Sequence, residues 1–207
     1  MDKQEQLGEL KKKMFLDETL PLRKGASQLV FGEGDPESEI MFIGEGPGYH
    51  EDQKGRPFVG NAGAFLNQLL ITVGLDRKKV FITNVVHHRP PQNRDPEPAE
   101  IEAYQFYLDD MINIINPKII ITLGRFSMGK FLPAARITGV HGKKFEVEWK
   151  GKKKIVVPMY HPAAGLRNPD VKRQTIEDFK GLPGILETAK KEVESEKKEE
   201  AEQITLV

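Results

Sequence analysis

The amino-acid sequence predicts an α/β fold, a three-layer α/β/α sandwich with a central four-stranded parallel sheet. Four short apolar runs rich in β-branched residues, at 39–43, 79–83, 118–123 and 154–159, are typical of buried parallel strands. Between them lie segments whose apolar residues have helical spacing, notably 62–73 and 98–115. Strands that alternate with helices favour right-handed crossovers, and therefore an open sheet with helices on both faces.

Local signals support individual elements. Residues 98–115 begin with Pro98 and acidic residues, as the first turn of a helix prefers. Residues 145–154 place a Lys-Gly-Lys turn between an alternating run and the last strand. We therefore expect a hairpin in which an antiparallel strand leads into strand 154–159.

Length and composition bound the domain organisation. With 207 residues and 38% hydrophobic content, the chain suits one domain, which we place at 1–190. Residues 191–207 are rich in lysine and glutamate, a composition typical of a solvated helix or a disordered tail. The opening segment is charged and no apolar run is long enough to cross a bilayer, so we expect a soluble, intracellular (cytoplasmic) protein without a membrane partner.

The charge balance and the absence of cysteine exclude several kinds of site. The 31 basic and 31 acidic residues give a net charge of zero, so any surface that binds nucleic acid must be local. The chain has no cysteine, which excludes disulfides, thiolate metal sites and a cysteine-held iron–sulfur cluster. His87 and His88 are neighbours without a third ligand at a recognised spacing, so no metal site is predicted.

Polar residues next to glycine or proline follow three of the four predicted strands. In an open parallel sheet, ligands bind beyond the carboxyl ends of the strands, so we expect these residues to converge on one pocket. The segments that follow the strands are Gly44-Glu45-Gly46-Pro47-Gly48, then Asn84 with residues 87–91, then Gly124-Arg125, and last Tyr160-His161-Pro162-Ala163-Ala164.

The glycine-rich segment after the first strand lacks the lysine and the serine or threonine of a P-loop, so nucleoside triphosphate binding is not expected. Its glycines, Gly46 among them, would let the backbone approach a ligand closely and hold Glu45 at the pocket mouth. A plain turn with a solvated glutamate is the alternative. Phe58 lies in a loop rich in glycine and proline, where an aromatic ring either anchors the loop or stacks on a flat ring.

Asn84 follows a buried strand, where capping is a common role. Its amide can also donate and accept at once, as reading the Watson–Crick edge of a pyrimidine requires. The loop 87–98 contains four prolines, so it is stiff and displays the positive charges of Arg89 and Arg94.

His161 also follows a predicted strand, where a histidine is often structural. The small-residue segment beyond it ends in Leu166 and Arg167. An exposed leucine beside an arginine would suit insertion into a nucleic-acid stack, with a phosphate contact next to it.

Several motifs occur together in the order and spacing of family 4 uracil-DNA glycosylases. They are GEGPG with Glu51-Asp52, GRPFVGNAG, TNVVHHRPPQNRDP and HPAAGLRNP. The chain resembles this family from about residue 30 to the end of the helix that follows HPAAGLRNP. The resemblance implies a DNA repair enzyme that flips deoxyuridine out of DNA, hydrolyses its N-glycosidic bond and leaves an abasic site. The implied partner is uracil-containing DNA, single- or double-stranded, and we expect the protein to be a monomer.

The same resemblance implies roles for individual residues. Glu45 would orient the attacking water or stabilise the sugar cation, and Phe58 would stack on uracil. Asn84 would read the polar edge of the base, and His161 would face its O2. The further contacts are Gly46 at the base, Arg89 and Arg94 at the DNA, and Leu166 and Arg167 in a loop that wedges into the duplex.

The chain departs from the family at the iron–sulfur cluster. Family 4 members usually carry four cysteines around it, and the matching positions here are Asp17, Leu20, His88 and Tyr104, so we expect no cofactor. The expected replacement is packing by Leu20 and Tyr104 with Asp17 paired to His88. A different metal held by Asp17 and His88 is the alternative. Alanine or a bulkier residue is commoner than Gly165 in the family, so a looser wedge loop is expected.

Other functions of the same crevice remain open at the level of sequence. A related branch attaches itself to DNA through a histidine in a KRRIH motif, which is absent here, although His87 and His88 lie in the same neighbourhood. A non-catalytic protein that binds uracil or damaged DNA, and a hydrolase of small nucleotides, are further alternatives. Residues 203–207 have a faint similarity to a sliding-clamp peptide but lack its aromatic pair.

Overall fold

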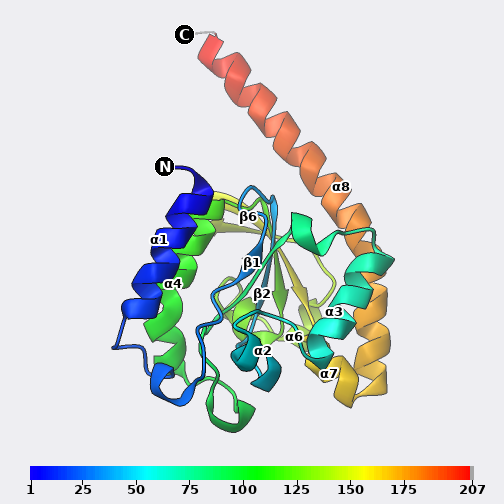
Figure 1. The fold of residues 1–207 in the computed structure, drawn as a ribbon. Helices are drawn as coiled ribbons and strands as arrows, with labels where there is room; N and C mark the ends of the chain where they lie inside the picture. Colours follow the sequence, from blue (N-terminus) through cyan, green and yellow to red (C-terminus); the bar gives the residue numbers. More distant parts are fainter. Residues whose placement is uncertain (206–207) are drawn as a thin grey trace.

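A twisted sheet runs through the centre of the molecule, with helices on both faces (Figure 1). The computed structural model describes residues 1–205, and the side chains of residues 1–189, 191 and 192. Six strands form the sheet in the order β1-β3-β2-β4-β6-β5. Their bounds are β1 Glu33–Gly34, β2 Ile40–Gly44, β3 Phe81–Asn84, β4 Ile119–Leu123, β5 Phe145–Trp149 and β6 Lys152–Met159.

The four predicted strands form the parallel centre of this sheet. β3, β2, β4 and β6 are adjacent and parallel, and each lies within two residues of its predicted bounds. The predicted α/β fold is therefore confirmed, but the sheet is larger than four strands because antiparallel β1 and β5 extend its two edges. β5 and β6 form the expected hairpin, with left-handed φ values of 50° at Lys150 and 74° at Gly151 in the turn.

The central strands bury both of their faces under helices. α1 Lys3–Leu16 and α4 Pro98–Ile115 cover one face, and α3 Asn61–Thr72 and α8 Pro169–Thr205 cover the other (Figure 1). In β2, Met41 and Ile43 pack with α1 and α4, whereas Ile40 and Phe42 pack with α3 and α8. This alternation follows the two-residue period of a strand and divides the core into two layers.

Both predicted helices form. α4 has the predicted bounds, and α3 begins and ends one residue before them. α1 is an addition to the predicted elements, in the charged opening segment. Leu7, Leu10 and Met14 are buried at the spacing of one helical face, and Asp2 caps the first turn. These three apolar residues are buried against α4. The segment is polar overall, so its composition alone does not indicate this buried face.

The remaining elements are short. They are α2 Tyr49–Lys54, α5 Arg125–Gly129, α6 Ile137–Val140, α7 Pro162–Arg167, and the 3₁₀ turns η1 Arg23–Gly25, η2 Arg77–Lys79 and η3 Pro91–Asn93. α7 corrects the expectation of a loop after His161: the histidine is the N-cap and Pro162 the first helical residue, a favoured place for proline. Residues 206 and 207 lie outside the described part of the chain, as do the side chains of the clamp-like residues 203–207. None of the described helices is long and apolar enough to span a bilayer.

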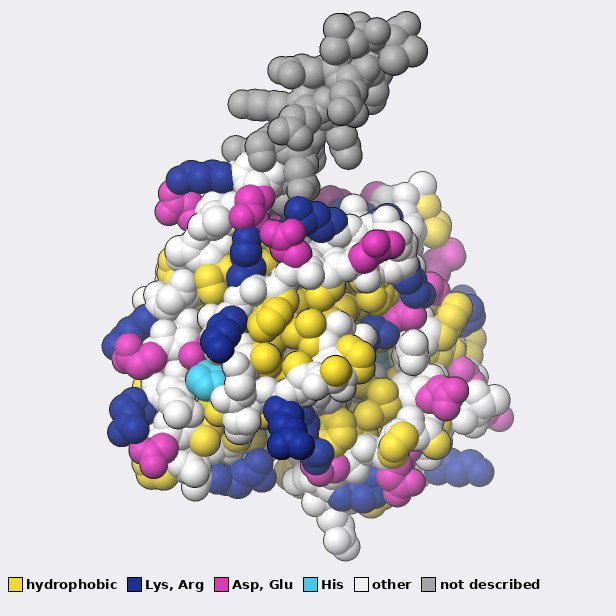
Figure 2. Space-filling model, turned by 180° about the vertical axis from the view of Figure 1, so that it is seen from behind, with side chains coloured by type: hydrophobic (Ala, Val, Ile, Leu, Met, Phe, Trp, Pro, Cys, Tyr) yellow, Lys and Arg dark blue, Asp and Glu magenta, His cyan; other side chains and the backbone are white. Residues whose placement is uncertain are grey.

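The rear of the molecule carries no dominant charge. Figure 2 shows that face, where cationic and anionic side chains are interspersed around an apolar area in the described part of the chain. This mixture agrees with a net charge of zero. This face of the described part of the chain therefore lacks the clustered positive charge that favours binding to nucleic acid.

Candidate active site

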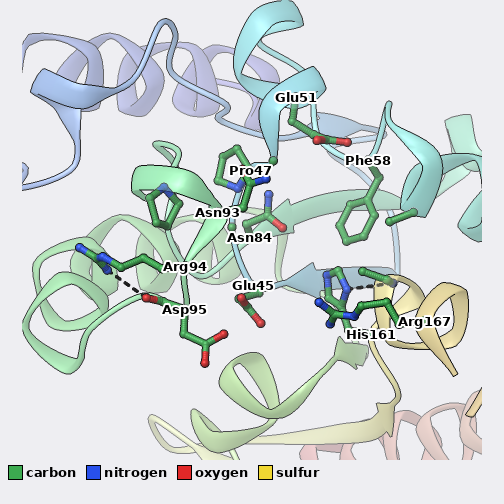
Figure 3. Close-up of a pocket in the computed structure, with 15 residues that line it drawn as sticks. Glu45, Pro47, Glu51, Phe58, Asn84, Asn93, Arg94, Asp95, His161 and Arg167 are labelled. Carbon is green, nitrogen blue, oxygen red and sulfur yellow. Dashed lines mark hydrogen bonds between the residues drawn. The ribbon is translucent and has the colours of Figure 1, made fainter.

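One pocket of about 310 Å³ lies where the parallel strands end, as the sequence predicts. Gly44 of β2 pairs in register with Asn84 of β3, and Leu123 of β4 with Met159 of β6, so the four carboxyl ends share one edge. The volume is at the small end of the range for small-molecule sites. The predicted residues that line the pocket are Glu45, Gly46, Phe58, Asn84, Arg94, His161 and Arg167. Figure 3 shows several of these side chains around one cavity.

Glu45 follows β2 directly and enters the pocket from the glycine-rich segment. Burial raises the pKa of Glu45 to about 7, the carboxylate of Asp95 adds to this, and the guanidinium groups of Arg125 and Arg167 oppose it. A carboxyl group with a pKa near neutrality can gain or lose a proton at working pH, which suits acid–base chemistry.

Asn84 is the last residue of β3 and is almost completely buried, with 1% of its surface exposed. Its Oδ1 has no hydrogen-bond partner in the described part of the chain. An unsatisfied buried carbonyl costs about 1–3 kcal/mol, a cost that a donor on a bound ligand would remove. The side chain lines the pocket beside Pro47 and Glu45, so the amide is available to such a ligand (Figure 3).

Phe58 is fixed in the loop before α3 by close packing. Its backbone is left-handed, with φ 51°, which is unusual for an aromatic residue. The Glu51 carboxylate holds this conformation, since Oε1 accepts hydrogen bonds from the backbone N–H of Val59 at 2.9 Å and of Gly60 at 2.7 Å. A Cβ atom at Gly44 would lie 2.6 Å from the Phe58 ring, so glycine is required beneath it.

His161 lies beside Phe58, with its ring centroid 5.7 Å from that of Phe58 (Figure 3). Burial lowers the pKa of His161 to about 4, and the positive charge of Arg167 acts in the same direction, so the imidazole is neutral at pH 7. Nδ1 accepts a hydrogen bond from the Ala163 N–H at 3.2 Å. The proton of the neutral ring is therefore on Nε2, which makes that atom a hydrogen-bond donor.

The pocket rim is formed by the proline-rich loop and carries paired charges. Arg94 makes two hydrogen bonds with Glu100 of α4, at 2.6 Å and 2.8 Å. Asp95 lines the pocket and pairs with Arg125 at the start of α5. Arg89 lies outside the pocket lining, where its guanidinium is 5.2 Å from the ring centroid of Tyr49.

Comparison with known proteins decides the family. Residues 31–180 match the family model described as the uracil DNA glycosylase superfamily. The chain belongs to this superfamily. Curated relatives named type-4 uracil-DNA glycosylase are 51% identical in Sulfurisphaera tokodaii (78% of this chain, 76% of the relative), 46% in Saccharolobus solfataricus (80% and 79%) and 44% in Archaeoglobus fulgidus (78% and 83%). The family 4 resemblance is thereby confirmed.

The positions that carry cluster cysteines in other family 4 glycosylases do not fit an iron–sulfur cluster here. No cysteine is present, and among the described residues no group of three or more histidines and acids could hold a metal ion. Leu20 and Tyr104 are buried in the core, as predicted. The predicted pair of Asp17 and His88 is wrong: Tyr107 donates to Asp17 at 2.7 Å, and Tyr104 shares a hydrogen bond with His88 Nδ1 at 2.8 Å. Tyr104 and Tyr107 lie one turn apart on α4, and each forms a hydrogen bond with one member of the predicted pair.

The segment expected to wedge into DNA is a helix in this glycosylase and not a loop. Leu166 lies on α7, is 46% exposed and does not line the pocket. Gly165 is buried, and a Cβ there would lie 3.1 Å from the Phe65 ring and 3.3 Å from the Lys172 Cα. The glycine therefore allows α7 to pack closely on α3 and α8, and the expected loosening at Gly165 stays a prediction.

Sequence reasoning assigned no role to three polar residues of the pocket, Glu51, Asn93 and Asp95. All three lie inside the quoted motifs, and Asn93 and Asp95 flank Arg94. The available signal was their position in glycine- and proline-rich segments beside the strand ends. Carboxylates in such segments are ordinarily solvated, so only the fold reveals that Glu51 holds the Phe58 loop and that Asp95 lies near enough to Glu45 to raise its pKa.

Proposed function

We propose that this chain excises uracil from DNA by hydrolysing the N-glycosidic bond, and that it acts in DNA repair. The observation that carries the proposal is the buried Asn84 amide, whose Oδ1 lacks a partner at the pocket. Uracil offers a donor at N3 and an acceptor at O4, which match Oδ1 and the amide nitrogen. Cytosine offers the opposite groups and would leave both buried amide atoms unpaired, a mismatch of the kind that can discriminate by about 10⁴.

The walls of the pocket suit a flat pyrimidine flipped out of the stack. Phe58 presents a ring held rigidly by the Glu51 contacts and by the close approach of Gly44. We place uracil against this ring, with its polar edge on Asn84 and its glycosidic bond toward Glu45. Gly46, which has no side chain, lines the pocket and lets the backbone approach the base.

His161 is suited to stabilise the leaving base. When the bond between C1′ and N1 breaks, its electron pair leaves on the base, and much of the negative charge develops on O2. The neutral His161 ring carries its proton on Nε2. This N–H can donate a hydrogen bond to O2 and stabilise its negative charge without giving up the proton.

Glu45 is suited to the sugar side of the reaction. The sugar becomes cation-like as the base leaves, and a nearby carboxylate stabilises that charge. Water then bonds through its oxygen to C1′ and gives up a proton, which Glu45 can accept because its pKa is raised to about 7. The products are free uracil and an abasic site.

The surroundings of the pocket support DNA as the substrate. We propose that Leu166 enters the space left by the flipped nucleotide and that Arg167, beside it, contacts a phosphate. Of the two arginines in the proline-rich loop, Arg89 is the better phosphate ligand because Glu100 already binds Arg94. We further propose that the protein acts as a monomer inside the cell, on single- or double-stranded DNA.

The covalent alternative lacks a suitable histidine. His87 and His88 are buried, with 0% and 4% of their surfaces exposed, and neither lines the pocket. Burial lowers the pKa of His87 to about 3 and of His88 to about 4. Among the described residues, His161 is the one histidine at the pocket, and its Nδ1 is already engaged.

The test is excision from oligonucleotides that contain one uracil, read by alkaline strand scission. Wild-type protein is expected to cut the uracil strand and to leave matched cytosine and thymine strands intact. Asn84→Ala and His161→Ala are each expected to lose at least about 100-fold in single-turnover rate. Absence of scission above a mock preparation would refute the enzymatic proposal and favour a binding protein.

A further inference from the structure

A second hollow, of about 630 Å³, lies between α1 and the end of α2. We infer that this groove binds the phosphate backbone of the single strand that flanks the flipped nucleotide, an inference that rests on the proposed function. The groove lining includes Gly8, Lys11, Lys12 and Phe15 of α1, Lys54 at the end of α2, and Arg56 two residues beyond that end.

The charge of the groove fits a phosphate chain. Four of its lining side chains are cationic, and no aspartate or glutamate is among the lining residues. Within the described part of the chain, Lys11, Lys12 and Lys54 form no ion pair, whereas Arg56 shares Glu33 with Arg77. Three lysine charges are therefore uncompensated at one place on a protein whose net charge is zero.

The groove also offers an aromatic surface. Phe15 is 59% exposed, and the Arg23 guanidinium carbon lies 6.0 Å from its ring centroid. Proteins that bind single strands without sequence preference combine a cationic groove with aromatic rings on which bases stack. An exposed phenylalanine beside uncompensated lysines meets both requirements, whereas a duplex would keep its bases out of reach of the ring.

The position of the groove suits the substrate strand. Gly48 and Glu51, at the start of α2, line the pocket, while Lys54 at its end lines the groove, and six helical residues span about 9 Å. Arg56 lies two residues before Phe58, so their Cα atoms are at most about 7 Å apart. With a rise of about 3.4 Å per stacked nucleotide, the groove is reached about two to three nucleotides from the flipped base.

Gly8 allows a test that removes no existing contact. It is exposed on α1, and a Cβ at this position would meet no atom within 4 Å. Gly8→Glu adds a negative charge inside the groove, and Gly8→Gln is its neutral match of similar shape. Both replace glycine within a helix by a better helix former, so neither is expected to weaken the fold.

Binding is measured by fluorescence anisotropy with a uracil-free 20-nucleotide single strand across a range of salt concentrations. Gly8→Glu is expected to weaken binding about three- to fivefold at low salt, and Gly8→Gln to leave it unchanged. The triple variant Lys11→Ala, Lys12→Ala, Lys54→Ala is expected to lower the slope of log Kd against log salt by about 2. The matched triple change at Arg173, Lys180 and Lys191 of α8, which are paired with acids, should leave the slope unchanged.

Excision assays then test how far along the DNA strand the groove lies from the pocket. With uracil at successive positions in a single strand, the groove variants should raise the half-saturating concentration and leave the saturated single-turnover rate unchanged. Shortening the strand on one side of the uracil to fewer than about two nucleotides should abolish the difference between the groove variants and wild type. Shortening it on the other side should leave that difference unchanged. Equal binding and salt slope in all variants would overturn the inference while wild-type excision still supports the proposed function. Failure of wild type to excise uracil would refute the proposed function, and the anisotropy result would still decide whether the groove binds DNA.

Discussion

Glu45 is predicted to destabilise the fold in its ionised state, and Glu45→Gln tests this. The pKa of Glu45 is about 7 in the folded protein and 4.5 in the unfolded reference. As pH rises from 4.5 to 7, the unfolded chain loses this proton while the folded protein keeps it, so stability falls across that window. The pKa difference corresponds to about 3 kcal/mol for a fully buried group, and solvent in the open pocket reduces it to about 1–3 kcal/mol.

Urea unfolding at pH 4 and pH 8 measures the effect. Glu45→Gln should be about 1–3 kcal/mol more stable than wild type at pH 8 and equal to it at pH 4. Glu177→Gln, which changes an exposed glutamate of α8, is the control and should stay within about 0.5 kcal/mol of wild type at both pH values. A Glu45→Gln variant with no gain at pH 8, or with the same gain at pH 4, would refute the reasoning.

The same ionisation should govern excision. If the carboxylate is the active form, the single-turnover rate falls about tenfold for each pH unit below 7, and at pH 5 about 1% of the protein is ionised. Glu45→Gln should lose both the activity and this pH dependence. If Glu45→Gln is both more stable to unfolding and less active in excision than wild type, the ionised Glu45 carboxylate supports activity at the expense of stability.

Three further changes test other parts of the site. Gly44→Ala places a Cβ 2.6 Å from the Phe58 ring and closer still to Asn84 Oδ1, so single-turnover excision should fall at least about tenfold; unchanged excision would show that the positions of this ring and this amide are unimportant. Tyr107→Phe removes the hydrogen bond to Asp17 and should cost about 1 kcal/mol in urea unfolding without changing excision, and a loss of excision would contradict a purely structural role. Leu166→Ala should slow excision from duplex DNA more than from single strands, and equal slowing of both would argue against a wedge.

The sheet and the main helices could be predicted because their signals are local. The apolar runs of β2, β3, β4 and β6 are bounded by turn residues, and α4 begins at a proline, so each was placed within two residues. Several elements were not predicted, and β1 and α7 show why. β1 has two residues and forms only because it pairs with β3, and α7 replaces a predicted loop because Gly165 allows close packing.

The residues of the candidate site were predictable from strand ends, but their environments were not. Glu45, Asn84 and His161 lie at or just beyond the carboxyl ends of strands, and parallel strands end at one edge of a sheet. That Tyr107 rather than His88 would bind Asp17 depends on which turn of α4 faces α1, and a single sequence does not fix that choice.

The measurement that tests the central claim most directly is mass spectrometry of a uracil-containing oligonucleotide after incubation with the protein, with the released base analysed alongside. The account predicts one free uracil per oligonucleotide and a strand in which the base is replaced by a hydroxyl group, with no mass added to the protein. Asn84→Ala should leave the strand intact. A protein–DNA adduct, or an unaltered strand bound by wild-type protein, would contradict the account.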